Sequence, residues 1–158
     1  MTTSQELLTN NQSITISLAS LGSGSYQQSA AIDNTSNLYF DAAVQFAIKT
    51  ASSGVSSTGS INVYAYGSAN GGSNYTDGCS GSNASFTPTS PTNLKLIGVI
   101  NAVANSTTYT GGPFSVAAGF GYLPGKWGVV VQNNTGAALD STEGNHLKFF
   151  EGQQVQSA

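Results

Sequence analysis

Residues 41–50 read DAAVQFAIKT, and Ala42, Val44, Phe46 and Ile48 occupy every second position. Because successive side chains of a β-strand point to opposite faces, this spacing predicts a strand with one apolar face. The intervening positions carry a glutamine and a lysine, which indicates that the other face meets water. The stretch therefore predicts a strand that covers a core on one side only.

The same alternation recurs along most of the chain. It is found at residues 13–18, 60–67, 93–101, 114–120, 126–133 and 147–149, with a weaker example at 23–31. Glycine, proline, asparagine and aspartate separate these segments, and helical spacing is sustained nowhere. About eight short strands in an all-β chain predict a two-sheet β-sandwich of jelly-roll type. An immunoglobulin-like sandwich is the competing topology.

The length of 158 residues indicates one domain. We expect the sandwich to occupy residues 13–151, between an N-terminal arm at 1–12 and a tail at 152–158. Apart from Leu7 and Leu8, neither end has apolar residues that could dock on the domain, so both are expected to be flexible arms that order against a neighbour. The irregular stretch 67–92 is long enough either to serve a function or to be a surface excursion.

Charge is scarce: 7 % of the residues are Asp, Glu, Lys or Arg, with four lysines, no arginine and one histidine. Acid–base catalysis, phosphate binding and metal binding all draw on such side chains, so we expect no enzyme, no cofactor and no metal site. A net charge of −3 disfavours nucleic acid as a partner. The sequence lacks a long apolar run and a signal-peptide pattern, which predicts no membrane span and no secretion.

Three groups of residues carry side chains that could take part in chemistry. The densest polar cluster contains Asp140, Ser141, Glu143 and His146. All four fall in one turn, whereas a metal site or a catalytic triad gathers residues from separate elements, so a solvated loop is expected. Asp33 and Asp41 are too far apart in sequence for a calcium loop. Cys79 has no partner for a disulfide and is expected to be an unreactive thiol, as suits a reducing cytoplasm.

Aromatic residues offer two different expectations. Trp127 alternates with Val129 and is therefore expected in the core. Tyr64 and Tyr66 lie opposite Val63 and its neighbours, which predicts an exposed pair. Such a pair serves either a packing or subunit contact or the binding of a sugar, on whose face an aromatic ring stacks.

Some strands are apolar on both faces. Leu94, Leu96 and Ile100 are expected to share a core face, while Ile97 and Val99 back them; Val130 likewise backs Trp127 and its neighbours. A second surface must cover the additional face, which predicts a homo-oligomer, with a trimer favoured. The expected interface residues are Leu7, Leu8, Tyr64, Tyr66, Ile97, Val99 and Val130.

Three stretches resemble a known family. They are GFGYLPGKWGVVVQNNTGAAL at 119–139, AAIDNTSNLYFDAAVQFAIKT at 30–50 and GSINVYAYGSANGG at 59–72. This succession is similar to small virion structural proteins of tailed bacteriophages, of the jelly-roll capsid cement or decoration type. The resemblance implies a non-enzymatic protein that is assembled in the host cytoplasm, binds the outer surface of the major capsid protein shell and stabilises the virion. A carbohydrate- or receptor-binding domain of a phage head or tail fibre is the alternative.

Overall fold

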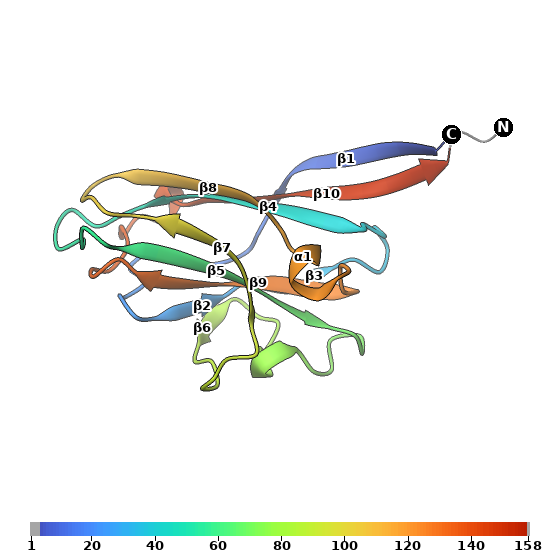
Figure 1. The fold of residues 1–158 in the computed structure, drawn as a ribbon, viewed down its shortest axis with the longest axis horizontal. Coiled ribbons are helices and arrows are strands. Elements are labelled where there is room, and N and C mark those ends of the chain that lie inside the picture. The colour runs from blue at the N-terminus through green and yellow to red at the C-terminus, as the bar shows by residue number, and fades with distance from the viewer. Residues whose placement is uncertain (1–3, 158) are drawn as a thin grey trace.

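The computed structural model describes residues 4–157, which form two antiparallel β-sheets packed face to face (Figure 1). The four-stranded sheet has the order β1 (Ser4–Ser13), β10 (Leu147–Ser157), β4 (Asp41–Lys49) and β8 (Thr108–Ser115). The six-stranded sheet has the order β6 (Ala84–Phe86), β2 (Tyr26–Gln28), β9 (Lys126–Asn134), β5 (Ser60–Ser68) and β7 (Lys95–Asn101), and β3 (Ile32–Asp33) also pairs with β9. The predicted all-β sandwich is confirmed.

The strand pairing is that of a jelly roll. Apart from the short strands β3 and β6, the first strand pairs with the last, the second with the next to last, and so on inward: β1 with β10, β2 with β9, β4 with β8, and β5 with β7. Two sheets wound in this nested way are the mark of a jelly roll, which selects it over the immunoglobulin-like topology. The helical elements among the described residues, η1 (Thr76–Gly78), α1 (Ala117–Phe120) and η2 (Glu143–Asn145), are far too short to span a membrane.

The core lies between the sheets and follows the sequence alternation. Val44 and Phe46 of β4 are fully buried, and so are Val63 of β5 and Val129 of β9. Burying each such side chain contributes roughly 1.5–3 kcal/mol. Trp127 is fully buried as well, which confirms its core assignment. Its ring meets that of Phe150 edge-on, with 5.2 Å between centroids and 87° between planes.

The two chain ends pair with each other. β1 and β10 run antiparallel from Ser4 opposite Ser157 to Ser13 opposite Phe149, and they extend side by side past the other strands (Figure 1). The expectation of two separate arms, each in need of a neighbour, is therefore wrong, because each end supplies the backbone partners of the other. Residues 1–3 and 158 of those arms lie outside the described residues.

The expected strand at 114–120 is partly wrong. β8 ends at Ser115 and the helix α1 follows, because a distant carboxylate turns the chain. Asp41 Oδ2 accepts a hydrogen bond from the hydroxyl of Ser115 at 2.6 Å, and Asp41 Oδ1 accepts one from the N–H of Ala117 at 2.9 Å. Gly121, with φ +80°, ends the helix in a left-handed conformation that suits glycine.

The expected common face of Leu94, Leu96 and Ile100 is also wrong. Opposite Val63 and Tyr64 of β5, the register of β7 shifts by one residue, since Gly98 pairs with Val63 whereas Leu96 pairs with Tyr64. This β-bulge reverses the facing of the residues before it. Leu96 is consequently 55 % exposed, and Ile97 is half-buried against the main core.

Candidate functional site

The loop between β5 and β7, residues 69–94, covers part of the outer face of the six-stranded sheet. A second apolar cluster forms between the loop and the sheet: the loop contributes Cys79 and Leu94, and the sheet contributes Tyr66 and Val130. Tyr26, Tyr64 and Phe86 pack against its edge. Tyr66 and Val130 are fully buried there, so their expected role as surface contacts is wrong. The cover that the apolar outer face requires is supplied by this chain's own loop.

Tyr66 fixes this cluster to the sheet. Its ring lies on Gly128, where a Cβ atom would come within 2.4 Å of the Tyr66 ring. Its hydroxyl donates a hydrogen bond of 2.7 Å to the carbonyl oxygen of Ser29, and its ring meets that of Tyr75 edge-on at 5.4 Å. Cys79 lies in the same cluster, where burial, and then the nearby Asp77 carboxylate, raises the pKa of its thiol to about 12. A thiol with so high a pKa is a poor nucleophile at neutral pH.

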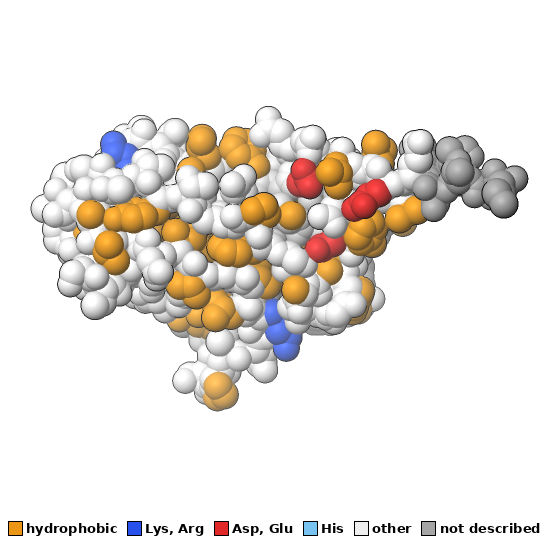
Figure 2. Space-filling model, turned by 45° about the horizontal axis from the view of Figure 1, so that its top comes forward, with side chains coloured by type: hydrophobic (Ala, Val, Ile, Leu, Met, Phe, Trp, Pro, Cys, Tyr) orange, Lys and Arg blue, Asp and Glu red, His pale blue; other side chains and the backbone are white. Residues whose placement is uncertain are grey.

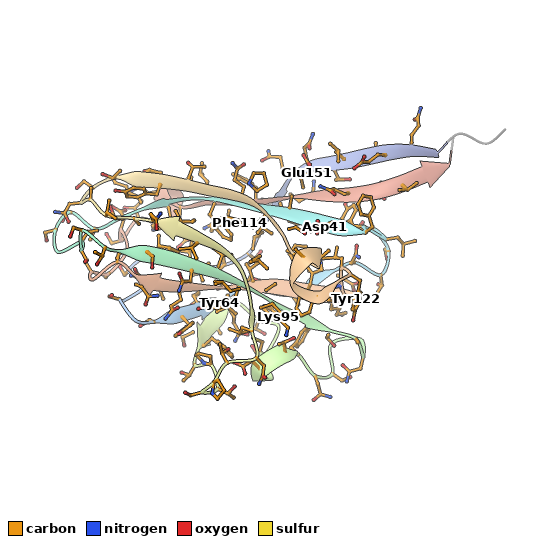
Figure 3. The ribbon with its side chains drawn as sticks, viewed as in Figure 1. Asp41, Tyr64, Lys95, Phe114, Tyr122 and Glu151 are labelled. Atoms are coloured by element: carbon orange, nitrogen blue, oxygen red, sulfur yellow. The ribbon has the colours of Figure 1, made fainter. Side chains whose placement is uncertain are left out.

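Beside this cluster, part of the same outer face stays open, including β6 of the loop segment itself. Five residues, one from each successive strand, form a cross-strand row of register partners, here called the outer row: Phe86, Tyr26, Gln132, Asn62 and Val99. Tyr64 lies two residues from Asn62 on the same face of β5. It is half-buried, on the side of the sheet away from Phe114 (Figure 3). Val99 is 48 % exposed. The expected accessible aromatic surface is therefore formed by Tyr64 and Tyr26. Tyr26 was not predicted from the sequence, because β2 is short and its alternation is weak.

A second candidate surface is the terminal ribbon, defined as residues 4–9 of β1 with 152–157 of β10. Leu7 and Leu8 are 44 % and 46 % exposed, and Val155 of the facing strand is 63 % exposed. Because adjacent residues of a strand point to opposite sides, Leu7 and Leu8 give the ribbon an apolar side chain on each face. Figure 2 shows hydrophobic and acidic side chains toward this projecting end of the molecule.

The polar cluster at 140–146 has a structural role. His146 is only 2 % exposed, with Nε2 3.0 Å from the carbonyl oxygen of Asp140 and Nδ1 accepting the N–H of Lys49 at 3.4 Å. Hydrogen bonds from Asn145 and Thr142 lower the pKa of Asp140 to about 2. The expectation of a solvated loop is thus wrong for the histidine, which ties this turn to the end of β4.

Glu143 connects the same turn to the opposite end of the chain. Its Oε2 accepts hydrogen bonds from the N–H groups of Leu18 and Ala19, both at 2.8 Å, and its Oε1 accepts one from the ammonium group of Lys148. Every carboxylate oxygen of Glu143 therefore serves the fold. The partners of the Glu143 carboxylate are two backbone N–H groups and an ammonium group, so these contacts do not place it as a base beside a nucleophile.

The two aspartates considered for calcium serve separate turns. Asp33 accepts hydrogen bonds from the N–H and hydroxyl of Thr35 and lies 3.5 Å from the ammonium group of Lys126, whereas Asp41 holds the start of α1. In the part of the chain that the structure describes, no three His, Cys, Asp or Glu residues are grouped so that they could hold a metal ion. A hollow of about 180 Å³ beside the ribbon has Glu151 as the sole titratable residue of its lining.

The fold thus defines a jelly-roll β-sandwich with two open surfaces, the outer row and the terminal ribbon. Comparisons with protein-family models, with curated proteins and with solved structures find no match to this chain.

Proposed function

We propose that this protein is a non-enzymatic capsid cement protein of a tailed bacteriophage, which binds the outer surface of the major capsid protein shell and stabilises the virion. The observation that carries the proposal is the terminal ribbon. A two-stranded extension with an apolar side chain on each face reaches away from its own core and offers contact area to a neighbouring protein.

The backbone of the ribbon supports the same proposal. β1 is an edge strand of the four-stranded sheet, so the N–H and C=O groups on its free side are available to another strand. Adding a strand to a sheet edge is a common mode of protein recognition, in which backbone hydrogen bonds give affinity and flanking side chains give specificity. Leu7 and Leu8 would supply those side chains. Glu6 is the one charged residue of the ribbon, which keeps the cost of desolvation low.

We further propose that the protein acts as a homo-oligomer, with a trimer as the favoured state. The surface available for self-association is smaller than the sequence indicates, because the chain itself buries Val130 and Tyr66 and half-buries Ile97. Val99 and Leu96 of β7 remain exposed at 48 % and 55 %. Sedimentation at tens of micromolar measures the state, and a clean monomer contradicts self-association in solution.

The test uses empty shells of the phage that carries this gene, prepared without the protein. Purified protein is added and its occupancy on the shells is measured by co-sedimentation and by cryo-electron microscopy. The double variant Leu7→Ser with Leu8→Ser should bind at least about tenfold more weakly, since losing two apolar contacts costs more than 1.4 kcal/mol. Val103→Ser, which alters an exposed valine outside the ribbon, is the matched control. Equal binding by the double variant and the control contradicts the role of the ribbon, and absence of wild-type binding contradicts the cement function.

A further inference from the structure

We propose that the outer row, apart from Val99 at the end assigned to self-association, is a binding site for a neutral oligosaccharide. Phe86, Tyr26, Gln132 and Asn62 are in-register neighbours across four strands, and each is half-buried, so part of each residue remains accessible. The rings of Tyr26 and Tyr64 have centroids 6.4 Å apart and planes inclined at 41°. Tyr26 is the register partner of Gln132 on the neighbouring strand, and the Tyr64 hydroxyl donates a hydrogen bond to Gln132. Aromatic rings beside amide groups are what a sugar requires, because its C–H face stacks on a ring while its hydroxyls need hydrogen-bond partners.

The hydrogen bonds within the row hold its amides in place. Gln132 Oε1 accepts one from the Tyr64 hydroxyl at 3.1 Å and one from Asn62 Nδ2 at 3.0 Å. This arrangement occupies the acceptor of Gln132 and a donor of Asn62. The Gln132 side chain also hydrogen-bonds the Tyr26 hydroxyl. An amide nitrogen carries two hydrogens, so Gln132 Nε2 keeps one to donate, and Asn62 Oδ1 remains an acceptor beside it. These hydrogen bonds hold a donor and an acceptor on adjacent strands, and adjacent strands are spaced about 5 Å apart. The two groups can therefore serve two hydroxyls of one pyranose ring.

The electrostatics select the class of ligand. None of the residues of the outer row, nor Tyr64, is charged, so the site has no group to compensate a phosphate, a sulfate or a carboxylate. A hollow of about 320 Å³ adjoins the row at Tyr26 and Phe86 and is otherwise lined by small and polar residues, which leaves room for a second sugar unit. A purely apolar partner would cover the remaining donor and acceptor of these amides without giving them hydrogen bonds, at a cost of about 1–3 kcal/mol each.

The site is independent of the proposed capsid contact. The outer row belongs to the six-stranded sheet, whereas the terminal ribbon extends from the four-stranded sheet. One molecule can therefore engage a shell and a glycan at the same time, which would give a decorated particle affinity for a glycan-coated surface. Because the row crosses paired strands, its groups are preorganised and lose little conformational entropy on binding.

The experiment begins with an array of neutral hexose and N-acetylhexosamine oligosaccharides, together with acidic glycans, probed with the full-length protein. The best neutral glycan is then titrated by calorimetry and by NMR, with the side-chain amide signals of Gln132 and Asn62 as reporters. Tyr26→Ala should weaken binding by about tenfold or more. Gln132→Met keeps the volume but removes the amide, both its donor and the acceptor that holds Tyr64 and Asn62, and should weaken binding by a similar factor. Tyr122→Ala is the matched control, because it removes a tyrosine that is 55 % exposed outside the row. We expect wild-type affinity from it.

Melting temperatures separate a lost site from a lost fold. If Tyr26→Ala unfolds, Gln132→Met carries the test, since its backbone and both tyrosines are retained. The proposal is overturned by the absence of neutral glycan binding at millimolar concentration, by a preference for acidic glycans, or by equal affinity of Gln132→Met and Tyr122→Ala. If Gln132→Met loses glycan binding but binds shells at the wild-type level, the two sites are separate. If no form of the protein binds shells, the cement function is contradicted and the glycan site is not.

Discussion

Replacing Tyr66 tests whether the loop at 69–94 is held to the sheet as the structure indicates. The Tyr66 side chain is fully buried, lies on Gly128 and donates a hydrogen bond to the carbonyl oxygen of Ser29. Removing a buried aromatic side chain costs about 3–5 kcal/mol. For a domain of this size each kcal/mol lowers the melting temperature by about 2–4 °C, so Tyr66→Ala should melt about 6–20 °C below the wild type.

Two further variants resolve the contributions to that loss. Tyr66→Phe keeps the ring and leaves the buried Ser29 carbonyl without its donor, which costs about 1–3 kcal/mol and a smaller drop in melting temperature. Tyr122→Ala, at an exposed position, should change the free energy of unfolding by no more than about 0.5 kcal/mol.

The assay combines thermal unfolding, followed by circular dichroism, with the reaction of Cys79 toward a thiol reagent under native conditions. Cys79 belongs to that loop and its side chain is buried against the sheet, so its labelling rate reports the opening of the loop. We expect Tyr66→Ala to label faster than the wild type, with Tyr66→Phe between the two. If Tyr66→Ala melts within about 2 °C of the wild type and Cys79 stays protected, the loop is anchored elsewhere and the reasoning fails.

Three other outcomes are expected. Trp127→Ala should lower the free energy of unfolding by about 3–5 kcal/mol. Trp127→Phe should lower it less, because it keeps an aromatic ring and also removes a buried indole N–H that has no acceptor among residues 4–157. Chemical denaturation of both variants measures the difference. The Cys79 thiol ionises near pH 9 in the unfolded chain and near pH 12 in the folded one, so melting temperatures should fall as the pH rises above 9, and the slope should be shallower in Cys79→Ala. Deleting residues 1–9 should leave the melting temperature nearly unchanged while reducing shell occupancy, because the described part of the lost strand, from Ser4 on, pairs with β10 alone. Unchanged occupancy would contradict the ribbon contact.

The sequence was informative about the site only in part. Tyr64 could be placed on an open face from the alternation of β5, and the structure retains it there. Tyr26 and Gln132 could not be assigned to the same surface, because their association depends on the pairing of β2 and β9, which are more than 90 residues apart along the chain. The resemblance to phage cement proteins stays a prediction, as do the capsid shell and the trimer.

Two errors share a cause in contacts between distant segments. Tyr66 and Val130 alternate with core residues and so were expected outside, yet residues 69–94 fold back over them. The segment after Ser115 was expected to continue as a strand, yet Asp41, 74 positions before that serine, turns it into a helix. The local sequence pattern predicts neither contact, because each joins segments that are far apart in the sequence and meet only in the folded chain.

What the sequence determined by itself is the all-β class and the core-facing side of the strands with strict alternation, such as β4, β5 and β9. Alternation is a property of neighbouring residues, and burying Val44, Phe46 and Trp127 gives enough free energy to make that choice wherever the strand lies. Only the tertiary structure decided that the two chain ends pair as a ribbon, and that the chain covers part of its own outer face. Those outcomes depend on which backbone groups and which apolar surfaces meet across the molecule, and a strand's own residues do not specify its partner.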